Sequence, residues 1–270
     1  MEITTGVHLI PVDAYAVFGI YAPNIYGVIG EKMVLIDTGY NDDILAGAIL
    51  NYLNNVVKSE LTHIMITHPH PDHIGGCQHI RAMTGAKVVV HSGSQKQAEN
   101  LGLEADMLVE DGETVDIDGN KIEIIHTPGH TRGNICLFLR NKGILFTGDH
   151  ILGIGTTVID TTDGDMAQYI KSLEKLQDYD IGLICPGHGP LIREPKRKIR
   201  ELIDHRIERE KQILLCLSRG KENVKDMIAE IYPELDSRLE GLANMQILAH
   251  LKKLINEGKV QETGEKFMLQ

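Results

Sequence analysis

The chain has 270 residues, of which 42% are hydrophobic and 24% are charged, and this composition is typical of folded globular proteins. It excludes collagen-like, low-complexity and intrinsically disordered chains, and no run approaches the roughly 18 apolar residues of a membrane-spanning helix. The net charge of −11 disfavours tight nonspecific binding to duplex nucleic acid, because such binding depends on cationic contacts to phosphates.

The cysteines and the N-terminus indicate a cellular compartment. The first five residues lack the basic-then-apolar order of a signal peptide, so we expect a cytoplasmic protein. The cysteines lie far apart and form no Cys-x-x-Cys pair, which argues against a disulfide framework and against an all-cysteine zinc site. We expect them to be small buried side chains in a reducing environment: Cys77, Cys136, Cys185 and Cys216.

Short strands dominate the first 190 residues, where β-branched and aromatic residues gather in brief runs between turn signals. Apolar residues at helical spacing predict helices over residues 42–57 and 165–176. Strand runs with occasional helices, repeated twice, predict two sheets with helices outside them. The predicted strands cover residues 7–11, 15–19, 26–30, 33–37, 61–67, 87–91, 121–126, 134–139, 143–147 and 181–185.

The pattern changes near residue 193. A long charged helix is predicted over residues 194–219, followed by helices over 221–231 and 239–257 and by a hairpin of 259–262 with 266–270. Helix, helix and hairpin together outline a winged helix. Residues 1–192 carry a net charge of −13, whereas residues 193–270 carry +2. We therefore predict two domains, 1–193 and 194–270, and the absence of a Gly/Ser/Pro-rich linker predicts that the second packs on the first.

The strongest chemical signal follows the predicted strand 61–67 directly. His68, His70, Asp72 and His73 lie within six positions, and imidazole and carboxylate groups suit zinc and related metals. His68 and His70 are two apart, so an extended loop projects them the same way. Asp72 and His73 continue onto a helix start, where they can face a second ion. A polar surface loop is the alternative, but four ligand-type residues at this spacing are rarely accidental.

Three further candidate ligands each follow a strand. His130 lies in Thr-Pro-Gly-His-Thr, Asp149 in Thr-Gly-Asp-His, and His188 in Cys-Pro-Gly-His-Gly. Each by itself is more typical of a turn residue. Together with the first group they predict one site, built from loops at one edge of a sheet sandwich.

This series of motifs resembles the metallo-β-lactamase-fold hydrolases over roughly residues 5–192, with Asp37 in Leu-Ile-Asp-Thr-Gly as the first block. The resemblance implies a four-layer αββα sandwich with a two-metal centre. Carried over, it assigns His68, His70 and His130 to the first metal, Asp72, His73 and His188 to the second, and Asp149 to both. Asp37 would support a ligand, or be an ordinary residue at a strand end.

The tail extends the resemblance to the β-lactamase-like-protein-2 family, which ends in a winged helix. Its hallmarks appear as Gly-Asp-His-Ile-Leu-Gly from residue 148, His205-Arg206, Arg209-Glu210 and His-Leu-Lys-Lys-Leu from residue 250. Animal members resemble single-strand endoribonucleases, and fungal relatives resemble thioesterases that act on carrier-bound polyketides.

The resulting hypothesis is a cytoplasmic hydrolase with two zinc ions, or iron or manganese in their place. It cleaves single-stranded RNA phosphodiesters with a metal-bound hydroxide that Asp72 and Asp149 orient. The alternative is a thioesterase or lactonase, similar to glyoxalase II, that acts on a small acyl substrate. A nucleic-acid-binding regulator with a vestigial hydrolase body is disfavoured, because nothing structural requires so complete a ligand set.

The role of the tail stays open. The basic run of residues 195–200, together with Lys252 and Lys253, contacts phosphates in one interpretation and forms a solvated helix face in the other. The winged helix binds nucleic acid, covers the active site or forms a homodimer contact.

The remaining histidines are expected to have structural roles rather than to bind metal or take part in catalysis. His126 is expected to support its loop. A substrate contact or proton donor is the less favoured alternative for His150. We expect the others at the surface of strands and helices: His8, His63, His79 and His91.

Overall fold

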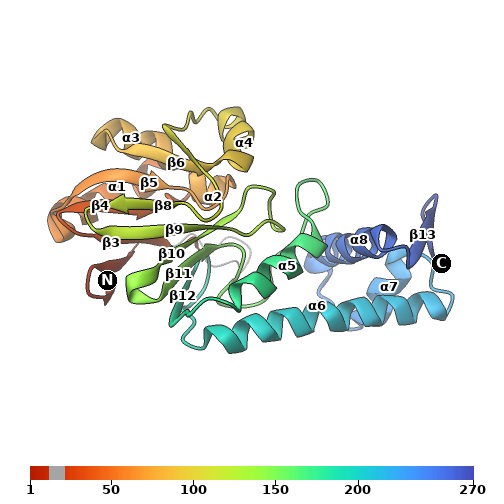
Figure 1. Ribbon diagram of the computed structural model, residues 1–270. Coiled ribbons are helices and arrows are strands. Elements are labelled where there is room, and N and C mark those ends of the chain that lie inside the picture. The colour runs from red at the N-terminus through yellow and green to blue at the C-terminus, as the bar shows by residue number, and fades with distance from the viewer. Residues whose placement is uncertain (12–21) are drawn as a thin grey trace. The chain divides into compact units, whose positions relative to one another are not determined.

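The computed structural model describes residues 1–11 and 22–270 (Figure 1). The strand predicted at residues 15–19 lies outside the described residues. The chain forms two compact units. The first unit comprises Met1–Thr127, Gly133–Gly155 and Asp180–Pro195, and the second comprises Pro128–Arg132, Thr156–Tyr179 and Lys196–Gln270. The second unit thus includes two segments that precede residue 193, and the predicted boundary at that residue stays a prediction.

A seven-stranded sheet of the first unit has its described strands in chain order. The pairs β1–β2, β2–β3 and β3–β4 are antiparallel. The pairs β4–β5, β5–β6 and β6–β7 are parallel. Parallel strands need long connections, and helices supply them here. The strands are β1 (Glu2–Thr4), β2 (Val7–Ile10), β3 (Ile25–Ile29), β4 (Lys32–Ile36), β5 (Glu60–Met65), β6 (Lys87–His91) and β7 (Met107–Val109).

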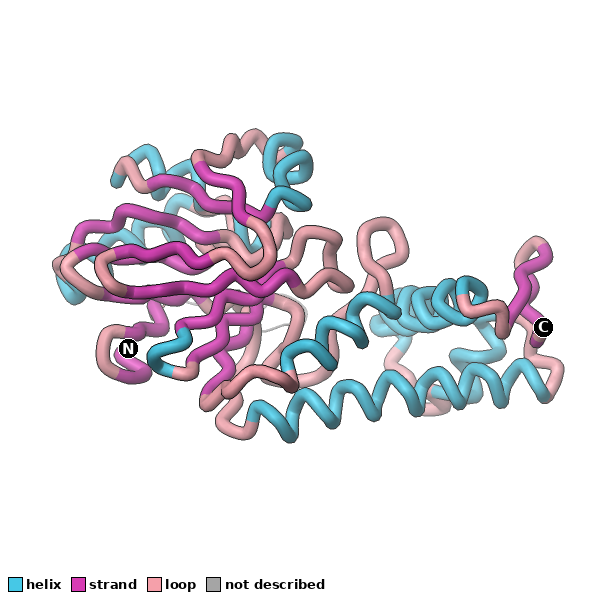
Figure 2. Tube along the Cα trace, viewed as in Figure 1, coloured by secondary structure: helices cyan, strands magenta, loops and turns pink. Residues whose placement is uncertain are grey.

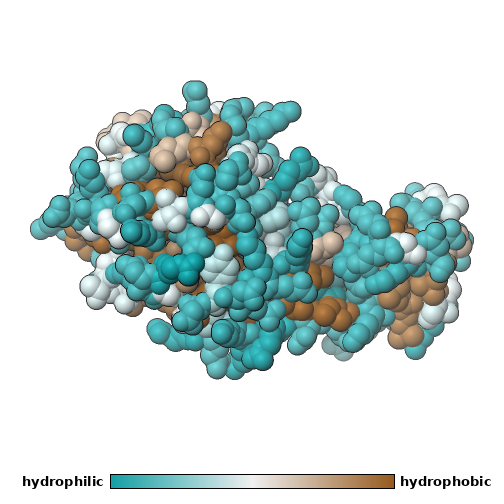
Figure 3. Space-filling model, viewed as in Figure 1, coloured by the Kyte–Doolittle hydropathy of each residue, from teal (hydrophilic) through white to brown (hydrophobic). Residues whose placement is uncertain are grey.

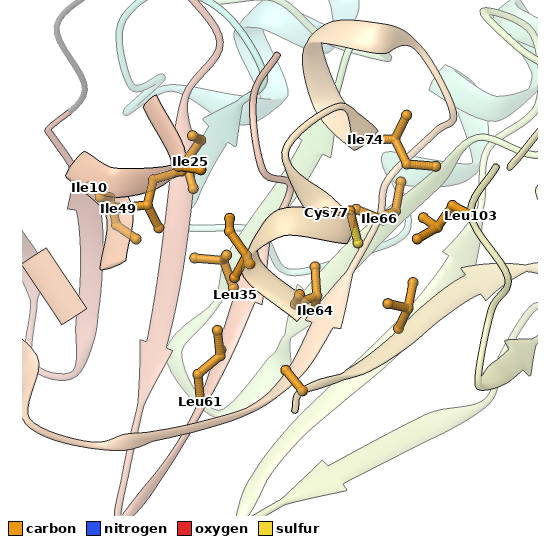
Figure 4. Packing of buried hydrophobic residues seen from close by; sticks show 14 of the residues in the cluster. Ile10, Ile25, Leu35, Ile49, Leu61, Ile64, Ile66, Ile74, Cys77 and Leu103 are labelled. Carbon is orange, nitrogen blue, oxygen red and sulfur yellow. The ribbon is translucent and has the colours of Figure 1, made fainter. Parts of the chain in front are cut away.

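The helices of the first unit pack on one face of this sheet. Asp42 caps the first of them by accepting a hydrogen bond from the backbone N–H of Leu45. Figure 4 shows the apolar cluster beneath these helices, with Cys77 beside Ile66. All four cysteines are buried thiols, as predicted. The helices are α1 (Asp43–Tyr52), continued by a π-helical turn (Leu53–Val57), α2 (Pro71–Ile74), α3 (Cys77–Thr84) and α4 (Gln95–Asn100).

A five-stranded sheet lies against the other face of the first sheet. Its order is β12-β11-β10-β9-β8, and only the β11–β12 pair is parallel among these described strands. The alternation along β4 explains the two apolar layers, because Met33 and Leu35 face the helices while Val34 and Ile36 face the second sheet. The predicted sandwich of two sheets with flanking helices is confirmed. The strands are β8 (Thr114–Ile117), β9 (Asn120–His126), β10 (Ile135–Leu139), β11 (Ile144–Gly148) and β12 (Leu183–Pro186).

The second unit has its own apolar core, which α6, α7, α8 and the terminal hairpin share. Figure 2 shows the succession of helices and the short hairpin that the sequence predicted. One boundary differs by more than one residue: Asn223 caps the second tail helix, which therefore begins after it rather than at residue 221. The elements are α5 (Met166–Leu176), α6 (Pro195–Ser218), α7 (Val224–Ile231), α8 (Glu240–Asn256), β13 (Val260–Thr263) and β14 (Lys266–Leu269).

Several short elements escaped the sequence analysis: β1, α3, α4, β7 and β8. They span three to eight residues, too few for a periodic pattern to emerge. On the face shown in Figure 3 hydrophilic side chains predominate, with apolar patches between them. Among the described residues, every helix falls short of the length and apolar character that crossing a membrane requires.

Candidate metal centre

The first unit brings the ends of distant strands together at one edge. Asp37 directly follows β4, and His68 follows the parallel neighbour β5. Asp149 directly follows β11, and His188 follows its parallel neighbour β12. Because parallel neighbours end on the same side, each pair of strands delivers its side chains to a common place. These residues of the first unit therefore lie together at one edge of the sheets, and their assignment as metal ligands stays a prediction.

One compact group contains Asp72, His73, Asp149 and His188, each of which offers a ligand atom within 4.8 Å of the others. Nε2 of His188 lies 3.1 Å from Oδ2 of Asp72 and 3.4 Å from Oδ1 of Asp149. Nε2 of His73 lies 3.3 Å from the same Asp149 oxygen and 3.2 Å from Nε2 of His188. Ligands that each lie about 2 Å from one ion are separated by about 3 Å, so this spacing fits a divalent cation.

Asp37 fixes the orientation of His73. Its Oδ2 accepts a hydrogen bond of 2.8 Å from Nδ1 of His73, which leaves Nε2 directed at the group. The same carboxylate accepts from the backbone N–H and the hydroxyl of Thr67. Asp37 adopts a positive φ of 57°, which an aspartate tolerates better than most residues. It therefore acts through His73 rather than as an ordinary strand-end residue.

Thr67 extends this support to a second histidine. Because its hydroxyl hydrogen goes to Asp37, its oxygen accepts from Nδ1–H of His68, 3.1 Å away. Nε2 of His68 then carries the lone pair that can bind a metal, and it lies 3.1 Å from Nδ1 of His70. The two nitrogens converge as the His-x-His spacing predicted. The role of Thr67 was not predicted from the sequence, although its place between a strand and the first histidine is a usable signal.

His130 belongs to the second unit. Its Nδ1 lies 2.8 Å from the backbone carbonyl oxygen of Val158, which can only accept, so this nitrogen carries the proton. Nε2 is again the nitrogen with the lone pair. The placement of His130 beside His68 and His70 stays a prediction.

The electrostatics favour ionised carboxylates in the group. Burial opposes ionisation of Asp149, but the neighbouring His73 outweighs it and holds the pKa of Asp149 well below its usual range. Burial likewise opposes ionisation of Asp72, and the hydrogen bond from His188 lowers its pKa overall. Burial lowers the pKa of His73, but the charges of Asp149 and Asp37 raise it well above its usual value. Negative charge thus gathers where a cation would bind.

Two glycines are required by the close packing of the centre. A Cβ atom on Gly187 would lie 2.6 Å from Oδ1 of Asp149 and 2.8 Å from Cε1 of His73. Gly148 has a φ of +48°, and a Cβ there would lie 2.3 Å from Oγ1 of Thr67. Both glycines stand in the motifs around Asp149 and His188, but their close packing could not be predicted from those motifs.

The other histidines lie outside these groups. His91 was expected at the surface, but it is 4% exposed and stacks on the ring of His126 at 4.1 Å. The expectation was wrong because both faces of β6 are covered. His150 is fully buried. His79 is paired with Asp43 at 3.0 Å.

Comparisons with known proteins agree with this geometry. Residues 19–188 match the metallo-beta-lactamase superfamily, and residues 224–267 match the beta-lactamase associated winged helix domain. A Beta-lactamase-like protein 2 homolog from Caenorhabditis elegans is 35% identical over 235 residues, which cover 86% of this chain and 78% of that protein. An atrochrysone carboxyl ACP thioesterase from Aspergillus fumigatus is 30% identical over 210 residues, which cover 73% of this chain and 61% of that protein.

A solved structure matches the fold over the whole length of the chain. The crystal structure of a metallo-beta-lactamase family protein from Thermus thermophilus superposes with a TM-score of 0.81 at 21% identity and covers all of both chains. With the matched domains and the metal-ligand group, these findings show that the chain is a metallo-beta-lactamase-superfamily hydrolase with a C-terminal winged-helix domain and belongs to the family of beta-lactamase-like protein 2.

Proposed function

We propose that the chain is a hydrolase that works with two divalent metal ions, most simply zinc, with iron or manganese as alternatives. The observation that carries this proposal is the convergence of two imidazoles and two carboxylates in the group of Asp72, His73, Asp149 and His188. Nitrogen and carboxylate oxygen donors suit these metals, and thiolates are not needed. Asp37 behind His73 supplies the support that metal-binding histidines usually have.

Each ligand has a defined part in this proposal. The first ion is bound by His68, His70 and His130, the second by Asp72, His73 and His188, and Asp149 is shared. When bound, two such ions lower the pKa of water towards neutrality and neutralise charge on the substrate oxygens.

Asp72 and Asp149 are the catalytic carboxylates. Their side chains are 20% and 16% exposed, so both reach solvent at the centre. Ionised at neutral pH, they accept hydrogen bonds from the attacking water and orient it.

Single-stranded RNA is the first candidate substrate. The first two turns of α6 carry Lys196, Arg197, Lys198 and Arg200, and Lys196 lies eight positions after His188 in the chain. Lys196 and Arg200 are exposed, while Arg197 pairs with Glu201. Cations at this point suit a substrate whose backbone repeats a negative charge. We place the activity in the cytoplasm, where the four buried thiols stay reduced.

The two lysines of α8 contribute less than the sequence suggested. Lys253 is engaged by Glu210 and Glu257, and its side chain is only 13% exposed. Lys252 donates to the backbone carbonyl of Thr161. We therefore assign strand binding to the start of α6 rather than to α8.

A thioesterase acting on an acyl substrate is the second candidate. Its support is the similarity to a protein named as a carrier-protein thioesterase. The second unit also holds a pocket of about 250 Å³, and apolar side chains such as Val158, Leu235 and Leu242 form much of its wall. A pocket of this kind suits an acyl group better than a charged strand.

The deciding experiment compares wild type with His70→Ala, prepared identically, on single-stranded RNA and on an acyl thioester. The proposal expects RNA cleavage by wild type and loss of it in His70→Ala, with His79→Ala as a matched histidine control that keeps activity. If both preparations cut RNA equally while only wild type hydrolyses the thioester, the second candidate replaces the first. If His70→Ala retains every activity, the two-metal proposal is wrong.

Cation replacement separates the two substrates further. Changing Lys196, Arg197 and Arg200 to Gln removes positive charge at the start of α6. For single-stranded RNA each lost phosphate contact flattens the slope of log binding constant against log salt by about 0.7. Thioester hydrolysis should be unchanged, because that substrate has no strand to hold. An unaltered salt slope for RNA would contradict the assigned strand contact.

A further inference from the structure

A buried arginine lies in the second unit with no role in the proposed chemistry. Arg206, in the middle of α6, is 1% exposed. Its Nη1 donates to Oε1 of Gln246 and its Nη2 to the backbone carbonyl of Thr157, both at 2.6 Å, and its guanidinium lies 5.0 Å from the centre of the Tyr169 ring. Both of these hydrogen-bond acceptors are uncharged. Burying an arginine is costly, and the hydrogen bonds of Arg206 are used here to fix the side chain of Gln246 and the backbone carbonyl of Thr157.

What Arg206 holds is one backbone carbonyl. Nε2 of Gln246, on α8, also donates to the carbonyl oxygen of Thr157, at 3.4 Å. Donors from two helices therefore converge on this oxygen, in a loop without regular structure between β11 and α5. The carbonyl of Thr157 belongs to the planar peptide that joins it to Val158, so fixing it restrains the backbone of Val158.

Val158 in turn orients a predicted metal ligand. Its carbonyl oxygen accepts a hydrogen bond from Nδ1–H of His130 at 2.8 Å. A neutral imidazole with a proton on Nδ1 presents its lone pair on Nε2. The contacts thus run from Arg206 to Thr157, through one peptide to Val158, and from Val158 to His130, all within the second unit.

We propose that Arg206 is a positioning residue that holds the loop at Thr157, so that the Val158 carbonyl keeps His130 in the tautomer with its lone pair on Nε2. The metal-binding part of this proposal depends on the proposed function, because there His130 binds the first ion. The tautomer itself is a property of the metal-free chain, so it can be tested separately.

The first test reads the tautomer directly. Nitrogen-15 NMR of the full-length protein, stripped of metal, distinguishes a protonated Nδ1 from a protonated Nε2, and His130→Gln identifies the His130 signals. Wild type should show a single form with the proton on Nδ1, and Arg206→Met a mixture of both forms. Arg206→Lys, which keeps a charged donor, should restore part of the wild-type signal. Arg219→Met replaces an exposed arginine just past the same helix and should leave the spectrum unchanged.

The second test measures metal affinity by competition with a chelator, using zinc alone. Residues that support a metal-binding histidine typically contribute about 10–100-fold to affinity. Arg206→Met should weaken one of the two ions by about this factor and leave the other at its wild-type affinity. Arg219→Met should change neither.

A second, less disruptive variant keeps the proposal testable. If Arg206→Met does not fold, Gln246→Leu removes the partner of Nη1 and the second donor to Thr157 while it keeps the arginine. This variant should also give mixed tautomers. A folded variant of either kind with wild-type tautomer and wild-type affinities overturns the proposal. If wild type binds no zinc but Arg206→Met still mixes the tautomers, the proposed function fails and the positioning role of Arg206 stands.

Discussion

Histidines in the two units are oriented by different means. In the first unit the carboxylate of Asp37 accepts directly from His73 and, through the hydroxyl of Thr67, orients His68 as well. In the second unit the backbone carbonyl of Val158 accepts from His130, and Arg206 holds that loop from a distant helix. A carboxylate adds negative charge and makes the imidazole a stronger ligand, whereas a carbonyl fixes the tautomer without a net charge. In the first unit the supporting group thus supplies negative charge and also orients the histidine. In the second unit the supporting carbonyl only orients the histidine.

Asp149→Asn should have the largest effect, because it removes the anion that both ions are proposed to share. Wild type purified without chelator should contain close to two metal ions per chain by elemental analysis. The variant should lose affinity for both ions by more than the roughly 10–100-fold typical of supporting residues. A wild-type stoichiometry that never exceeds one after zinc addition would contradict the two-metal centre.

Gly187→Ala should come next, because the added Cβ meets Oδ1 of Asp149 at 2.6 Å and the ring of His73 at 2.8 Å. We expect a loss of stability of about 1–3 kcal/mol in urea unfolding, together with weaker metal binding. Gly182→Ala is the matched control, since its Cβ would make an ordinary contact at 3.6 Å. If the two variants have the same unfolding free energy and the same metal affinity, the side chains around Gly187 can move enough to accept the added Cβ atom.

Asp37→Asn tests whether charge matters beyond orientation. The amide oxygen can still accept a hydrogen bond, but the negative charge behind His73 is gone. We expect about 10–100-fold weaker binding of the second ion in chelator competition. Asp43→Asn, at an exposed carboxylate that pairs with His79, should bind metal like wild type. Wild-type affinity in Asp37→Asn would mean that the carboxylate, like the Val158 carbonyl, only orients its histidine.

The smallest effect, counted per pH unit, is expected at His250 of the second unit. This side chain is fully buried, and neither ring nitrogen has a hydrogen-bond partner among the described residues. Burial, reinforced by the charge of Arg206, lowers the pKa of His250 to about 3. In the unfolded chain the pKa is about 6.5, so the folded state binds the proton more weakly. Stability that depends on neutral His250 is fully present above pH of about 6.5 and is lost as pH falls towards the folded value.

Urea unfolding of the metal-free protein measures this dependence. Below pH of about 6.5 wild type should lose about 1 kcal/mol of unfolding free energy per pH unit through this residue. His250→Leu should show a shallower loss over the same range, because no proton is taken up there on unfolding. Identical slopes for the two proteins would show that His250 does not remain neutral in the fold.

The fold and most candidate ligands were accessible from local patterns. Runs of β-branched and aromatic residues between turn signals indicated the longer strands, and caps and helical spacing indicated the three helices of the tail. The short elements β7 and α4 were missed because so few residues do not show the periodic pattern of apolar side chains that marks a strand or a helix. The burial of His91 was missed because it depends on what covers β6, and a strand pattern does not contain that information.

The sequence by itself determined which side chains are available for metal chemistry, because imidazole and carboxylate groups at His68, His70, Asp72 and His73 are spaced for it by the local chain alone. Only the tertiary structure decided what supports them. Asp37 reaches His73 across 36 positions and Arg206 reaches Thr157 across 49. The first contact depends on the parallel pairing of β4 with β5, and the second on how α6 packs beside a loop. Hydrogen bonds over such separations are set by strand pairing and helix packing, which no local pattern of residues specifies.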